Sequence, residues 1–243
     1  MVAVIVDVGQ MDDLEEVRAR ALNCGAIRAH VVDRRELFAR AAIVPAVATP
    51  APLDGESIRR LAHPVVAATL VEVAAIEGAD AVAHAASHSL LDAAVARLAP
   101  ALPLLAPARD WTASHVEPSD YVKAYRLPHS VVRPERNLLM RPASATAPDP
   151  DAAAFVTVGF EDGIAVAVND VAMILPDLVE SLSLIGGQYQ LSAADTPSAP
   201  AALLLQAAYR ASRGVGAVTL KLQAGSLSVV DASERRPVLV NQS

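Results

Sequence analysis

The chain has 243 residues, of which 53% are hydrophobic, and carries 27 acidic against 20 basic side chains for a net charge of −7. This apolar share excludes a wholly disordered chain, and the length suits one large domain or two small ones. The acidic balance and an aromatic content of only 3% argue against a nucleic-acid or anionic-membrane surface. The single cysteine, Cys24, excludes an internal disulfide and a cysteine-rich zinc site.

The pattern of the chain also predicts its location. Residues 1–7 have neither the basic start nor the long apolar stretch of a signal peptide. The best candidate for a membrane span, residues 65–76, is short and contains Glu72. We therefore expect a cytoplasmic protein with no membrane partner.

Strands and helices are predicted to alternate in the first half. The apolar runs at 2–6, 29–32, 81–85 and 102–106 predict strands, and helices are expected at 14–22, 33–38, 57–77 and 89–98. Asp12 or Asp13 would cap the first helix, and Pro64 marks a kink or junction in the third. The alternation predicts an α/β domain with a mostly parallel sheet. Ligands of such sheets sit beyond the carboxyl ends of strands, here residues 7–10, 84–88 and 107–111.

The second half has a different pattern. Residues 127–150 are rich in proline and predict a connection between domains. Beyond it, hairpins are expected at 155–168 and 218–230, and helices at 175–184 and 201–211, with Gly186 and Gly187 ending the first of these helices. The sequence thus predicts an α/β domain at 1–126, a connection at 127–150 and a smaller α+β domain at 151–243.

Candidate site residues gather after the strand at 81–85. His84 and His88 are four residues apart and Asp92 follows four later, but a metal pair would need further ligands, so no metal site is expected. Ser87 and Ser89 flank His88, without the glycine-flanked turn of a serine nucleophile. Ser89 is more simply a helix N-cap with Asp92 in the first turn. The acidic residues at 12–16 predict a cap and a solvated helix face, and the arginines at 133–141 a solvated linker.

Several short segments, in the same order along nearly the whole chain, resemble one family, argininosuccinate synthase. They are 6–10 (Val-Asp-Val-Gly-Gln), 13–18, 31–33 with 36–38, 62–64 (Ala-His-Pro), 78–84 (Gly-Ala-Asp-Ala-Val-Ala-His), 104–107, 109–111 (Arg-Asp-Trp), 137–138 (Asn-Leu) and 220–225.

The resemblance implies a fold and an activity. The fold is a Rossmann-like parallel sheet of the adenine nucleotide alpha hydrolase type, followed by a synthetase domain, in a homotetramer. The activity is a step of arginine biosynthesis that joins citrulline to aspartate and splits ATP into AMP and pyrophosphate. Asp7, Gly9 and Gln10 would lie on the nucleotide side.

The chain also departs from the family pattern. The Ser-Gly-Gly loop that cradles pyrophosphate is absent from the sequence, and the segments at 51–60 and 190–198 do not match. After His84, Ser87 stands in for a threonine and Asp92 keeps an aspartate, but Leu91 and Val95 replace an asparagine and an arginine that bind ligands. Each lost charged hydrogen bond costs about 1.5–3 kcal/mol.

Three hypotheses follow. The favoured one is a non-catalytic binding, scaffolding or regulatory relative, acting as a homo-oligomer or with a different protein, with no cofactor and with a small amino-acid-like molecule as a further ligand. The second is an enzyme of altered chemistry in the former ligand cleft, with His88 and Asp92 as catalytic residues and His88 as the acid or base. Ser87, Ser89 and Asp92 would bind its substrate, and Asp7 would lie in the same cleft. The third is an ordinary ligase, which would require ATP and an unrecorded N-terminal segment.

Overall fold

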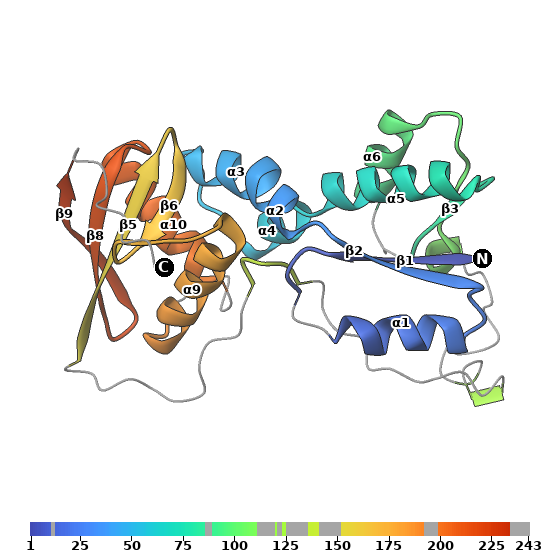
Figure 1. Cartoon of the computed structure of the whole chain (residues 1–243), viewed down its shortest axis with the longest axis horizontal. Helices are drawn as coiled ribbons and strands as arrows, with labels where there is room; N and C mark the ends of the chain where they lie inside the picture. Colours follow the sequence, from blue (N-terminus) through green and yellow to red (C-terminus); the bar gives the residue numbers. More distant parts are fainter. Residues whose placement is uncertain are drawn as a thin grey trace. The chain divides into compact units, whose positions relative to one another are not determined.

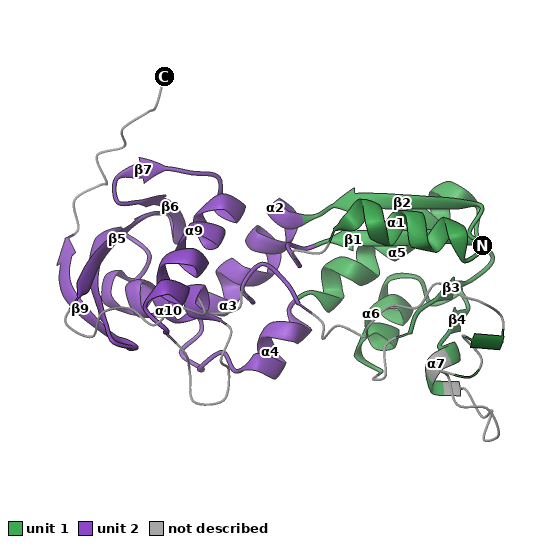
Figure 2. Ribbon diagram, turned by 90° about the horizontal axis from the view of Figure 1, so that it is seen from below, with its two compact units in different colours: residues 1–7, 12–34, 62–135 green, residues 8–11, 35–61, 136–243 purple. Residues whose placement is uncertain are grey.

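The computed structural model describes residues 1–10, 13–85, 89–110, 120, 123–124, 136–140, 152–191 and 199–233. The chain forms two compact units (Figure 2): unit 1 holds residues 1–7, 12–34 and 62–135, and unit 2 holds residues 8–11, 35–61 and 136–243. Residues 35–61 thus pack with unit 2, whereas the sequence-based division placed them in the first domain. No helix of the described part is both long and apolar enough to cross a membrane.

Unit 1 contains two pairs of parallel strands. β1 (Val2–Asp7) pairs with β2 (Arg28–Asp33), and β3 (Val82–Ala83) pairs with β4 (Leu104–Leu105). Helix α1 (Leu14–Asn23) connects β1 to β2. In Figure 1, α1 lies on one side of the strands, and α5 (His63–Glu77) and α6 (Leu90–Leu98) lie on the other. The parallel pairing and the helices between the strands confirm the predicted α/β class for this part of the chain.

The first helix of unit 1 begins where the sequence indicates, whereas the helix predicted over 57–77 is divided, since residues 55–60 form a separate helix and α5 starts at His63. The Asp13 carboxylate accepts a hydrogen bond from the Glu16 N–H at 3.0 Å, which caps α1. Pro64 lies in the first turn of α5, where its missing N–H leaves no bond unmade, so it is a junction and not a kink. Ala67 of α5 packs with Leu91, Ala94 and Val95 of α6 to form a buried cluster.

Unit 2 contains a five-stranded antiparallel sheet with the order β7-β6-β5-β8-β9. Both predicted hairpins are confirmed, and residues at their turns have the positive φ angles that tight turns need, among them Asp162 and Gly163 (49° and 82°). The strands are β5 (Ala153–Glu161), β6 (Ile164–Val168), β7 (Val171–Ala172), β8 (Gly216–Gln223) and β9 (Ser226–Ser233).

Two long helices pack against each other and against this sheet, α9 (Leu175–Gln188) and α10 (Pro200–Ser212). The prediction that Gly186 and Gly187 end the first helix was wrong, because both lie inside α9 and are buried. A Cβ atom on Gly186 would lie only 2.6 Å from the Pro200 Cβ. The glycine therefore allows α10 to approach closely, and tertiary packing overrides the usual role of glycine as a helix end.

Residues 35–61 add short helical segments to unit 2. The helix predicted to end at Phe38 instead continues through a π-helical turn, in which Ala39 and Ile43 are buried. The segments are α2 (Arg35–Phe38), η1 (Ala39–Ile43), α3 (Val44–Ala48) and α4 (Gly55–Arg60). Gln206 and Arg210 of α10 donate hydrogen bonds to the carbonyls of Ala51 and Pro50, which holds the loop after α3 against α10.

Candidate functional site

Three charged or titratable side chains meet at the carboxyl ends of β3 and β4. His84 follows β3 directly, and Arg109 lies in α7 (Pro107–Asp110), which follows β4. Asp92 lies in the first turn of α6. The backbone holds the two strand ends together, because the His84 N–H donates to the Leu105 carbonyl at 3.0 Å. The predicted ligand edge of the sheet therefore carries a cluster of one imidazole, one carboxylate and one guanidinium.

Both oxygens of the Asp92 carboxylate are engaged in this cluster. Oδ1 lies 2.8 Å from Nε2 of His84, and Oδ2 accepts a hydrogen bond from Nη2 of Arg109 at 2.6 Å. The His84 side chain is only 6% exposed, whereas Asp92 and Arg109 are 25% and 34% exposed. Asp92 thus bridges a buried ring and a partly exposed cation.

Electrostatics favour the ionised form of this carboxylate. The hydrogen bond from Arg109 is the main cause that lowers the pKa of Asp92, and the contact with His84 acts in the same direction. Partial burial opposes both but does not reverse the shift. An ionised carboxylate beside an imidazole fixes the orientation of the ring, as in the acid–base pairs of many enzymes.

The structure confirms only part of the predicted helix start at Ser89. Ser89 occupies the N-cap position of α6 and Asp92 lies in the first turn, but the Ser89 side chain makes no capping hydrogen bond. Ser87 and His88, the predicted substrate-binding and acid–base residues, lie outside the described residues.

Two apolar side chains of α6, Leu91 and Val95, lie in the core. Val95 is fully buried and Leu91 is 6% exposed, both packed in the cluster with Ala67 and Ala94. These are the two positions at which the resemblance implied ligand-binding asparagine and arginine. In this chain they join α6 to α5.

The residues expected on the nucleotide side make backbone contacts. The Asp7 carbonyl accepts the Arg34 N–H at 2.9 Å, which continues the β1–β2 pairing in unit 1. In unit 2, the Gln10 Oε1 accepts a hydrogen bond from the Val8 N–H at 2.8 Å, which stabilises the local conformation of residues 8–10. Gly9 has a φ of +83°, and a Cβ on it would lie 2.8 Å from Leu138 Cδ1, so only glycine fits there. These contacts give Gly9 and Gln10 structural roles.

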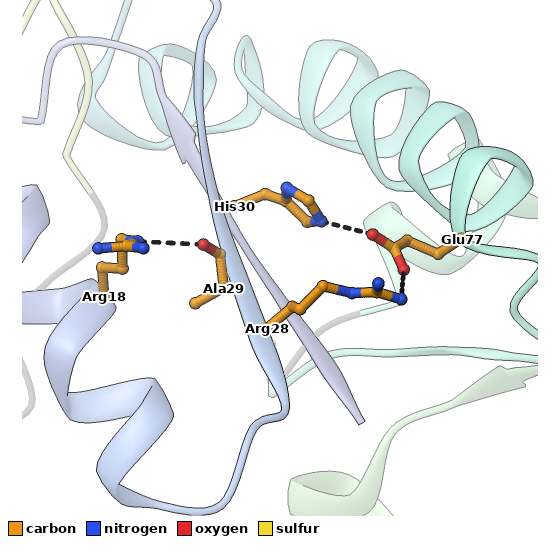
Figure 3. Close-up of polar contacts among 5 residues, drawn as sticks. All are labelled: Arg18, Arg28, Ala29, His30 and Glu77. Atoms are coloured by element: carbon orange, nitrogen blue, oxygen red, sulfur yellow. Dashed lines mark hydrogen bonds and ion pairs between the residues drawn. The ribbon is translucent and has the colours of Figure 1, made fainter.

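A second charged cluster lies near the amino-terminal end of β2. Figure 3 shows Arg28 and His30 pointing from β2 toward Glu77, the last residue of α5. His30 Nε2 lies 2.7 Å from Glu77 Oε1, and Arg28 pairs with the other oxygen. The Glu77 side chain is only 9% exposed. Since this cluster lies away from the carboxyl ends of the strands, we assign it a structural role in joining β2 to α5.

Arg109 is the site residue that sequence reasoning missed. The sequence places Arg109 in a matching segment and at a predicted strand end but assigns it no role, and it considers His84 as a possible metal ligand. No sequence period joins residues 84, 92 and 109, since they come from a strand end and two different helices. The one available signal was that 84–88 and 107–111 were both predicted strand ends. Among the described residues, no three His, Cys, Asp or Glu side chains are grouped to hold a metal ion.

Comparison with known proteins agrees with the resemblance. A family model, "Arginosuccinate synthase N-terminal HUP domain", matches residues 1–128. The argininosuccinate synthase of Synechococcus elongatus is 31% identical over 227 residues, covering 80% of this chain and 57% of the relative. That of Pyrobaculum aerophilum is 34% identical, covering 76% and 54%, and that of Streptococcus thermophilus is 28% identical, covering 100% and 69%. The chain thus spans little more than half the length of the first two relatives.

Proposed function

The chain belongs to the argininosuccinate synthase family, and we propose that it has lost the ATP-dependent joining of citrulline to aspartate and now acts as a non-catalytic protein that binds a protein partner. The support for this proposal lies in the first turns of helix α6 in unit 1. It needs no bound nucleotide.

The main support for the proposal is that two side chains in the first turns of α6 are buried in the core of unit 1. Leu91 and Val95 are core residues, so neither side chain reaches a ligand at the strand ends. The polar residue retained between them, Asp92, has both carboxylate oxygens engaged by His84 and Arg109. Placing a polar amide or a guanidinium back at these buried positions would cost several kcal/mol, about 2–7 for an unpaired polar group. In this chain these α6 side chains therefore serve to pack α6 against α5, which supports the loss of ligand binding.

A second candidate function has one observation in its favour. The contact between His84 and Asp92 lies at the carboxyl edge of the strands, where a carboxylate-held imidazole can act as acid or base. An enzyme of altered chemistry would use this pair. Its substrate would be a small amino-acid-like molecule, and the variant His84→Gln would abolish its turnover.

Two measurements test the proposed function. Protein purified from its native host should elute from a size-exclusion column with light-scattering detection as an oligomer or a complex, and a strictly monomeric protein would count against a partner. A thermal-shift panel with ATP, citrulline, aspartate, arginine and argininosuccinate should show no shift. A ligand at a hundred times its Kd would add about 2.7 kcal/mol and raise Tm by several degrees, and such a shift would favour the enzyme of altered chemistry.

A further inference from the structure

We draw no further inference here: the strongest candidate, the edge of the unit 2 sheet formed by strand β9 with its exposed Val229 and Val230, carries nothing because nothing in the described part of the chain shows what covers it.

Discussion

Arg109 donates a hydrogen bond to Asp92 at 2.6 Å, although the two residues lie on different helices and are separated by a strand. This contact holds the start of α6 against the segment that follows β4. It also keeps the Asp92 carboxylate ionised, and the first prediction follows from that.

Asp92→Asn should reduce the loss of folding stability that occurs as the pH falls. The pKa of Asp92 is lowered in the folded state, chiefly by Arg109, so its stabilisation is present above the unfolded-state pKa of about 4 and is lost as pH falls through the folded-state pKa. Urea unfolding at about pH 3 and about pH 5 should therefore show a smaller loss of stability in the variant than in the unaltered protein. Asp231→Asn, at an exposed position of β9, is the control. If D92N and the unaltered protein lost equal stability between these two pH values, protonation of Asp92 would not contribute to the loss.

Leu91→Asn should destabilise the protein by about 3 kcal/mol, because it removes a buried apolar side chain and buries an amide. The matched control is Leu90→Asn, one residue earlier on α6 and 40% exposed, which should change stability by less than about 0.5 kcal/mol. Chemical denaturation of both variants measures the difference. If L91N were as stable as L90N, the position would not be part of the core, and the main support for lost ligand binding would fail.

Gly186→Ala should destabilise unit 2 even though alanine favours helices by about 1 kcal/mol over glycine. The added methyl group would meet the Pro200 Cβ at 2.6 Å and Leu204 Cδ1 at 3.1 Å, and such overpacking costs about 1–3 kcal/mol. We expect a net loss on the order of 1 kcal/mol in thermal or urea unfolding. Leu184→Ala, 51% exposed on the same helix, should be nearly neutral. A stabilised G186A protein would mean that α9 and α10 do not pack this closely.

Glu77→Gln should cost about 1–2 kcal/mol, since it removes the charge that Arg28 and His30 share at the end of α5. Glu72→Gln on the same helix is the control: Glu72 pairs with Arg34 but is 55% exposed, so its loss should stay below about 1 kcal/mol. Hydrogen exchange of β2 amides in both variants would locate the effect. Equal behaviour of the two variants would contradict a structural role for Glu77.

Local signals predicted much of the fold. Asp13 caps α1 because its carboxylate is placed to accept from Glu16, and the turn at Asp162 and Gly163 forms because both residues tolerate positive φ. These features depend on neighbours within a few residues. The predicted strands and helices of residues 2–34 and 62–105 were accordingly confirmed in type, with shifted ends.

Long-range packing accounts for what sequence reasoning missed. Gly186 was expected to end a helix, and only the approach of Pro200 explains why it lies inside one. Residues 35–61 join unit 2 partly through contacts such as Gln206 with the Ala51 carbonyl, 155 positions apart. The Arg109 and Asp92 contact likewise joins segments that no local pattern connects.

The most direct test of lost catalysis is a ligation assay on protein purified from its native host. Pyrophosphate release from ATP is measured with citrulline and aspartate, beside the Streptococcus thermophilus synthase as the positive control. We predict no release that depends on both amino acids, because α6 packs Leu91 and Val95 into the core. Formation of argininosuccinate by the purified protein would contradict this account.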